Sequence, residues 1–451
     1  MKDAGSNRTM MIGAGDSTWS GNSATPSFGL QRADKWLPNL ERMLDTLAAR
    51  GLDGLVLHLR PNVFYMSGYA SRVSASRHEH EGLGAVVISR TAPMEAVLIA
   101  EITDFTYFLN QPTWIEDIRT YVPWLLPPDP SAESSAFDRF VSTSVRSTTW
   151  GARARETIAE GFLPACRKAM TDLGLMRARV GFDDLGFAAN LRCDEVDVVN
   201  AVGTMKFIRQ IKTPEEVRRL RQAHAVNEIA IANTIASWSQ GMRWSELSHI
   251  YDLNCVALGA YPQYGGGMIL ANAEEIVPTF HSWGGESDDF VVEPGMSLMI
   301  DCHGYIDQYR WDGGKTWVVD DERQGDAVLI QRAAIEAARV VQDRLRPGAG
   351  VNDVIREARG VFKTMGVPEW DRALVFFHGM GLDGTDIEIK DASMRPNWRL
   401  EKGMAIATHV AFPGDSRSRF YIEDVEIVRP DGGESLFSWD FEPHPNSRAA
   451  V

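Results

Sequence analysis

The stretch Ser297–Thr316, SLMIDCHGYIDQYRWDGGKT, decides the fold of the C-terminal half of the chain. Two runs of apolar and aromatic residues in this stretch predict two strands. Each run ends at a carboxylate, and these carboxylates, Asp301 and Asp312, are eleven residues apart. A strand, a turn containing Gly304 and a returning strand would bring these carboxylates side by side. Because like charges disfavour joint ionisation, two close carboxylates share a cation or a proton.

Three more side chains that can ligate a metal lie in apolar runs further along the chain. His378 follows ALVFF, His409 lies in MAIATHVAF and Glu423 lies in RFYIEDVEIV. A single Asp at a strand end is usually a turn residue, and a single His after an apolar run is usually a packed core residue. Burying a charge is costly, however, unless the charge is paired or binds a metal. Five such residues together therefore predict one metal centre inside a sheet-rich domain.

The alternation of FYIEDVEIV places Glu423 on one face of its strand, together with Tyr421 and Val425. A carboxylate between apolar neighbours needs a partner, which a metal ion would supply. Asp424 and Glu426 then lie on the other face of the strand, where we expect solvent.

Length and composition predict a two-domain globular protein. The chain has 451 residues, of which 44% are hydrophobic and 24% charged, and its formal net charge is −15. The acidic balance argues against a nucleic-acid partner, which would need a basic face. Four cysteines without a CxxC pair indicate neither a zinc knuckle nor a disulfide framework. No apolar run approaches the ~20 residues of a membrane helix, and the N-terminus lacks a signal-peptide core, so we expect a cytoplasmic protein without membrane contact.

The order of elements suggests four segments. We expect a flexible arm at 1–33, a small α/β domain at 34–202, a larger domain at 203–440 and a tail at 441–451. The longest helical signal is at 204–240, where Thr213, Pro214 and Glu216 are typical of an N-cap, a first helical position and an early acid. Further helices are expected at about 244–258, 324–346 and 351–365.

The order of motifs resembles the pita-bread superfamily of creatinase, prolidase, aminopeptidase P and methionine aminopeptidase over about residues 34–440. The motifs are IKTPEEVRRLRQA, EPGMSLMIDCHG, DGGKT, HGMGLDG, LEKGMAIA, YIEDVEIV and ESLFSWDFEP. The resemblance implies an α/β (α+β) fold, in which a curved, mostly antiparallel sheet flanked by helices forms the C-terminal domain beside a smaller creatinase-like N-terminal domain. It also implies a homodimer in which the small domain caps the neighbour's pocket.

The resemblance places four residues on metal-ligand positions of the superfamily: Asp301, Asp312, His378 and Glu423. The fifth position, a Glu in the family, is His409 here. A His can still ligate Mn, Fe, Co or Zn, but it removes one negative charge. We therefore expect one or two bound divalent ions. In one arrangement, His378, His409, Asp312 and Glu423 together fill a single metal site, and Asp301 binds a second ion only weakly. His303, two residues after Asp301, is another polar group near the ions.

The same resemblance suggests residues that act on substrate. His281, in VPTFHSWGG, falls on the His that contacts substrate in the peptidases and moves a proton in creatinase, although a surface-loop His is an alternative. We include His378 as a second catalytic residue. Peptidase members carry another His where this chain has Thr385. The candidate substrate-binding residues are His303, Thr385, Asp383, Tyr69, Arg77 and Trp311. Arg77 could hold a carboxylate, whereas Trp311 could equally be a core residue.

These expectations favour a metal-dependent hydrolase that cleaves a C–N bond of a small amino-acid-like or amidine-like compound, with His281 as the proton shuttle. The alternatives are an Xaa-Pro dipeptidase or aminopeptidase, a metal-dependent C–S lyase on the same scaffold, and a metal-free creatinase-like enzyme or binding module. The expected partner is a small-molecule or short-peptide substrate.

Overall fold

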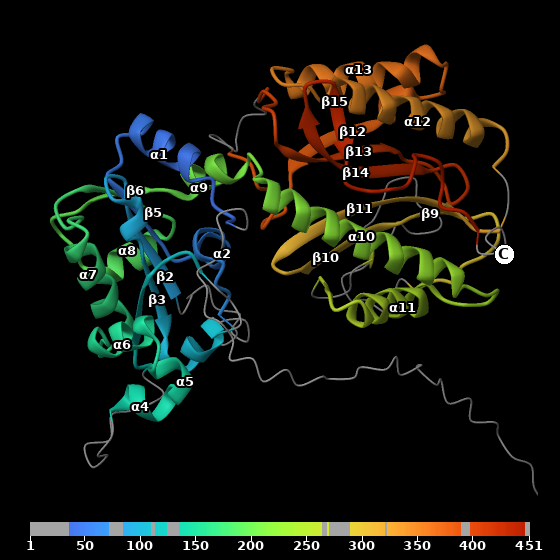
Figure 1. Cartoon of the computed structure of the whole chain (residues 1–451). Helices are drawn as coiled ribbons and strands as arrows, with labels where there is room; N and C mark the ends of the chain where they lie inside the picture. The colour runs from blue at the N-terminus through green and yellow to red at the C-terminus, as the bar shows by residue number, and fades with distance from the viewer. Residues whose placement is uncertain are drawn as a thin grey trace, which may run out of the picture.

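The computed structural model describes residues 36–71, 84–109, 113–123, 135–263, 268–269, 289–320, 323–388 and 397–446. The predicted arm at 1–33 lies outside the described residues. Two sheets lie side by side, one built from residues 54–200 and one from residues 261–435 (Figure 1). Their separation along the chain agrees with a domain division near residue 202, which stays our interpretation. In the part of the chain that the structure describes, no helix is long and apolar enough to cross a membrane.

The N-terminal sheet is six-stranded and mixed, with the order β4-β3-β2-β1-β5-β6. Its strands are β1 (Gly54–Leu57), β2 (Gly84–Ser89), β3 (Val97–Glu101), β4 (Asp117–Tyr121), β5 (Arg179–Phe182) and β6 (Asp197–Asn200). The helices of this half are α1 (Leu40–Ala49), α2 (Arg60–Ser67), α4 (Ala136–Phe140), α5 (Thr143–Arg146), α6 (Thr149–Glu156), α7 (Phe162–Asp172) and α8 (Leu185–Leu191), with short 3-10 helices η2 (Pro93–Glu95) and η3 (Ile102–Leu109). Helix α7 packs across β2, β3 and β4.

The C-terminal sheet is nine-stranded, and all its named strand pairs are antiparallel. Its main order is β12-β13-β14-β11-β10-β7, with β15 on β14, β8 on β10 and β9 on β11. The strands are β7 (Tyr261–Pro262), β8 (Met268–Ile269), β9 (Ser297–Met299), β10 (Asp301–Ile306), β11 (Tyr309–Val318), β12 (Leu374–Gly379), β13 (Ala405–Phe412), β14 (Phe420–Arg429) and β15 (Gly432–Ser435).

Two helix pairs flank this sheet (Figure 1). Helix α12 (Asp326–Arg344) packs on β13, β14 and β15 and is backed by α13 (Val351–Thr364), while α10 (Pro214–Ala236) contacts β10 and β11 and is paired with α11 (Trp244–Ala257). The 3-10 helix η5 (Trp370–Arg372) leads into β12. The helices predicted near 244–258, 324–346 and 351–365 are confirmed.

The long helix predicted at 204–240 is wrong as a single element. It is two helices, α9 (Val202–Arg209) and α10, with a break at 210–213. The break follows from the N-cap that the sequence predicted. Thr213 accepts from the Glu216 backbone and Glu216 accepts from the Thr213 backbone, and Pro214 stands at the first helical position. This capping box fixes the start of α10 at Pro214, so α9 ends before it and the two helices are separate.

The predicted hairpin forms, but its turn is not at Gly304. Asp307 and Gln308 connect β10 to β11, with φ values of 49° and 70°. Gly304 lies inside β10 directly opposite Trp311, and a Cβ at this position would lie 2.0 Å from Cζ2 of the indole. The glycine is therefore needed for the close approach of a large ring, not for a turn.

A buried ion cluster joins the two halves of the chain. Arg209 Nη2 lies 2.6 Å from Asp386 Oδ1, and Lys212 Nζ lies 2.7 Å from Asp386 Oδ2. Arg209 also donates to Asn62 of α2. Burial disfavours the Asp386 carboxylate, but Arg209 and Lys212 outweigh burial and hold the pKa of Asp386 below its usual value. The cluster fixes the segment after β12 against the N-terminal half.

Candidate metal centre

Six side chains that can ligate a metal project from one face of the C-terminal sheet. They come from five neighbouring strands: Asp301 and His303 from β10, Asp312 from β11, His378 from β12, His409 from β13 and Glu423 from β14. Residues directly opposite each other in an antiparallel pair share a face, as do residues two apart in one strand. The register therefore explains the convergence, because His303 lies opposite Asp312 and Glu423 lies opposite His409.

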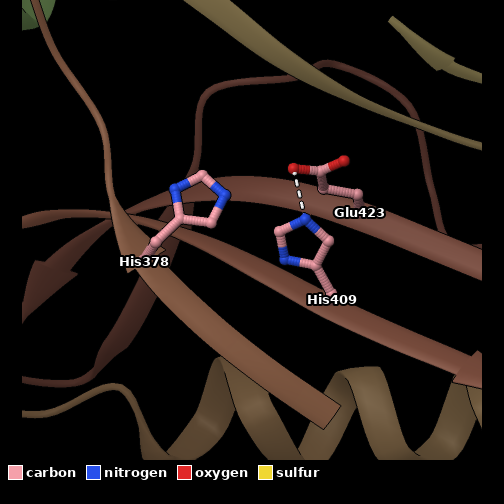
Figure 2. Close-up of side chains that lie close together, drawn as sticks. All are labelled: His378, His409 and Glu423. Atoms are coloured by element: carbon pink, nitrogen blue, oxygen red, sulfur yellow. Dashed lines mark ion pairs between the residues drawn. The ribbon is translucent and has the colours of Figure 1, made fainter. Parts of the chain in front are cut away.

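One group of donors is formed by His378, His409 and Glu423, whose possible ligand atoms all lie within 4.8 Å of one another. Figure 2 shows the two imidazole rings and the carboxylate turned toward a common centre. His409 Nε2 lies 2.8 Å from Glu423 Oε1. The hydroxyl of Tyr421 donates to the other oxygen of Glu423 at 2.5 Å, which fixes the orientation of the carboxylate.

A second group is formed by Asp301, His303 and Asp312, again within 4.8 Å of one another. His303 Nε2 lies 3.2 Å from Asp301 Oδ1, and His303 Nδ1 lies 2.8 Å from Asp312 Oδ1. The two groups meet at Asp312, because its Oδ2 lies 3.5 Å from His378 Nε2. The structure thus brings together all five candidate ligands predicted from the sequence, and His303, predicted to lie near the ions, is among them.

The donor set fits a divalent ion. Four of its buried atoms have no hydrogen-bond partner among the described residues: Asp301 Oδ1, Asp312 Oδ1, His409 Nδ1 and Glu423 Oε1. The three oxygens lie within contact distance of ring nitrogens, yet the ring N–H groups are not aligned with them. Neighbouring ligands held about 2.1 Å from one ion, at about 90–109°, lie about 3.0–3.4 Å apart. His409 Nε2 and Glu423 Oε1, 2.8 Å apart, come close to this separation, so these two side chains are placed much as ligands of a shared ion would be.

The electrostatics of the site also favour a cation. Burial, followed by the charges of Asp312 and Asp301, raises the pKa of Glu423 well above its usual value. Burial and the neighbouring His378 lower the pKa of His409 to about 4. Burial opposes charge on His303 as well, but Asp312 and Asp301 outweigh it and raise the pKa of His303 well above 6.5. Crowded carboxylates of this kind are stabilised by a positive charge between them.

Comparison with known proteins identifies the part of the chain that carries this centre. Residues 218–430 match the model of metallopeptidase family M24. This region is an M24 domain, the catalytic domain of the pita-bread superfamily. The result confirms the predicted superfamily, the predicted fold class and the predicted class of enzyme, a metal-dependent hydrolase.

Individual relatives of the M24 domain are distant. A Xaa-Pro dipeptidase from Pyrococcus furiosus is 23% identical over 237 residues, which are 51% of this chain and 64% of that protein, so the match spans less than two thirds of its length. Among solved structures, a Xaa-Pro dipeptidase from Bacillus anthracis has a TM-score of 0.65 at 18% identity and covers 90% of this chain and 98% of its own. An X-Pro aminopeptidase from Thermotoga maritima has a TM-score of 0.65 at 16% identity and covers 88% and 99%. These structures share the fold of the chain.

Two residues predicted to bind substrate, Trp311 and Tyr69, lie away from the metal centre. Trp311 is a core residue with 1% of its surface exposed, and its Nε1 donates to Tyr251 at 3.0 Å. Its neighbour in β11, Asp312, faces the metal centre, so alternation points Trp311 to the opposite face. Tyr69 is buried in the N-terminal half, where its hydroxyl donates to Asp104 at 2.6 Å. Neither side chain has exposed surface with which to contact a substrate.

Other predicted residues have different positions. Thr385 accepts a hydrogen bond from Lys206 Nζ at 2.8 Å, and Asp383 lies 3.6 Å from the same ammonium group. Both therefore contact helix α9, and their predicted role in substrate binding stays a prediction. His281 and Arg77 lie outside the described residues.

The prediction that Asp424 and Glu426 face solvent is wrong. Both are 1% exposed, because α12 packs on their face of β14 and β15 pairs beside them as the neighbouring strand. Asp424 accepts from Ser435 at 2.8 Å, and Glu426 accepts from Thr408 at 3.3 Å. Burial raises the pKa of Asp424 to about 7 and that of Glu426 well above its usual value. These carboxyl groups belong to the core of the M24 domain, not to its metal centre.

The sequence reasoning missed Phe376. This residue lies directly opposite His409 in the β12–β13 pair, and its ring stacks on the imidazole with centroids 4.0 Å apart. Phe376 is 46% exposed, so the imidazole of His409 is covered on one face by an apolar ring that solvent reaches. The signal was present, because Phe376 is two residues before His378 and therefore on the same face of its strand.

Proposed function

We propose that the chain hydrolyses a C–N bond of a small amino-acid-like or amidine-like compound, using a divalent ion held by Asp312, His378, His409 and Glu423. The observation that carries the proposal is the set of buried, converging donors without aligned hydrogen bonds among the described residues. Such groups are stable in a folded protein when a cation binds them. Mixed imidazole and carboxylate donors suit Mn, Fe, Co or Zn.

A divalent ion at this position would supply Lewis acidity, which activates water and polarises the bond to be cleaved. The protein's own residues prepare the site for that chemistry. Tyr421 holds the Glu423 carboxylate in one orientation by its short hydrogen bond. Phe376 packs on the face of His409 and limits rotation of that ring. Burial of the carboxylates keeps their charges strongly coupled, because little water screens them.

We further propose that His281 passes a proton to the leaving nitrogen. The support is the motif in which it stands, VPTFHSWGG, and the suitability of an imidazole for proton transfer near pH 7. A homodimer and a cytoplasmic location also stay our predictions.

A second candidate is an Xaa-Pro dipeptidase or aminopeptidase. It is favoured by the activity named for the Pyrococcus furiosus relative, a Xaa-Pro dipeptidase. Two features weigh against it. His409 replaces a carboxylate of the family, and Thr385 replaces a histidine and is bonded to Lys206. We therefore place hydrolysis of a small non-prolyl compound first.

Metal analysis and isotope labelling test the proposal together. Purified wild-type protein should contain divalent metal, His378→Ala should lose most of it, and His249→Ala should keep it, because His249 is an exposed residue of α11 far along the chain from the ligands. Folding of each variant is checked by circular dichroism.

Activity is then screened in 18O-labelled water with added Mn, using small amides, amidines and Xaa-Pro dipeptides. The proposal expects a product that carries 18O from a non-prolyl substrate. Turnover of Xaa-Pro dipeptides alone would establish the second candidate. An unsaturated product without 18O would indicate a lyase. Wild-type protein without metal would leave only a creatinase-like or binding role.

A further inference from the structure

The side chain of His303 lies between two acidic residues at the centre of the site. Its Nε2 is 3.2 Å from Asp301 and its Nδ1 is 2.8 Å from Asp312. Each carboxylate therefore contacts a different nitrogen of the same ring. Both acids are only 5% exposed, and the register holds His303 directly opposite Asp312.

This arrangement leaves little room for an ion between the two acids. An ion that bridges Asp301 and Asp312 must lie about 2.0–2.2 Å from an oxygen of each. The nitrogens of His303 already lie against Oδ1 of each acid. The two nitrogens of one imidazole also point in different directions, so they cannot both ligate one ion. A bridging ion would therefore require the ring to turn away from at least one carboxylate.

The other donor group contains one carboxylate, so no imidazole ring spans two acids there. His378, His409 and Glu423 each direct a donor atom toward a common centre, as Figure 2 shows. Asp312 contributes from the side, because its second oxygen lies 3.5 Å from His378 Nε2. The two donor groups thus differ. The donors of His378, His409 and Glu423 can surround an ion, whereas the ring of His303 lies between Asp301 and Asp312.

We propose that His303 takes the place of a second metal ion, so that each chain binds one divalent ion, at the His378–His409–Glu423 group. The inference rests on the proposed metal-dependent function. It predicts that the imidazole of His303 crosslinks Asp301 and Asp312, and that removing the ring opens a second cation site between these acids.

The number of bound ions tests this proposal directly. Wild-type protein, His303→Ala and His303→Ser are equilibrated with Mn²⁺, dialysed and analysed for Mn by plasma mass spectrometry. We expect one ion per wild-type chain and two per chain in both His303 variants. The matched control His249→Ala should bind one. Electron paramagnetic resonance adds a readout independent of activity, since a single Mn²⁺ gives an isolated six-line spectrum and two neighbouring ions give a spin-coupled one.

Each other outcome overturns the proposal. Two ions in the wild-type protein, with a coupled spectrum, would show that the ring does not exclude the second ion, and this result needs no variant to fold. Loss of the single ion in the His303 variants would make His303 a ligand. One ion in wild type and variants alike would show that the ring is not the obstacle. No ion in wild-type protein would refute the metal-dependent function itself, which separates its failure from that of the one-ion inference.

Discussion

Replacing Asp386 with Ala should lower the free energy of unfolding by about 3–5 kcal/mol, because the substitution leaves buried cations without their counter-ion. The side chains of Arg209 and Lys212 are 3% and 0% exposed, and both contact Asp386. Lys212 would keep one acceptor, the Arg209 carbonyl at 2.8 Å, and Arg209 would keep Asn62. These remaining bonds place the expected loss toward the lower end of the range.

Asp383 provides a matched control three residues away on the same segment. Its side chain is 43% exposed and lies 3.6 Å from Lys206, so Asp383→Ala should cost at most about 1 kcal/mol. Both variants and the wild type are unfolded in urea at about pH 7, and the transition is followed by circular dichroism. If Asp386→Ala were no less stable than Asp383→Ala, the buried cluster would not hold the two halves together as we argue.

The pH dependence of this contribution has a defined sign. The pKa of Asp386 is lower in the folded protein than its ordinary value, so the unfolded chain binds the proton more readily. The stabilisation is therefore present above the unfolded pKa of about 4 and is lost as pH falls through the lower, folded value. The stability difference between wild type and Asp386→Ala should be constant at about pH 6–8 and shrink below about pH 4.

Three further predictions concern the sheet and the metal centre. Gly304→Ala should lower the free energy of unfolding in urea by about 1–3 kcal/mol, because the added Cβ would meet the Trp311 ring. The control is Gly360→Ala in α13, where an added Cβ would have no neighbouring side chain within 4 Å. This variant should be as stable as the wild type or slightly more stable. Tyr421→Phe should weaken metal binding about 10–100-fold in a competition titration, since it removes the hydrogen bond that orients Glu423, and an unchanged affinity would contradict this role. Removing metal with a chelator should lower the melting temperature, and readdition of a divalent ion should restore it.

The convergence of the candidate ligands could be predicted from the sequence because they occupy special positions in otherwise apolar strands. Asp301, Asp312 and Glu423 stand where packing alone would call for an apolar residue, so their charge signals a partner. The start of α10 was predictable for a similar reason, since the capping box at Thr213 is a local interaction. Features of this kind depend on a few neighbouring residues and can be read from the chain directly.

Features set by tertiary contacts could not be predicted in this way. Gly304 resembles a turn residue until the indole of Trp311 is known to lie over it. Alternation correctly placed Asp424 and Glu426 opposite to Glu423, but it carries no information on whether a helix covers that face. Here α12 covers it, and both carboxyl groups are buried. Strand pattern thus fixes the face of a residue, whereas burial depends on what packs there.

The dependence of the centre on strand register links metal binding to the folding of the C-terminal sheet. No single strand carries a complete ligand set, and His409 meets Glu423 only because β13 and β14 pair with these residues opposite each other. A shift of one residue would turn Thr408 toward the centre and His409 toward the core, since side chains alternate between faces. An ion that binds the native arrangement therefore favours one register over its alternatives. An ion at the proposed site would stabilise the sheet that forms the site, and we expect its removal to weaken the pairing of β12, β13 and β14 first.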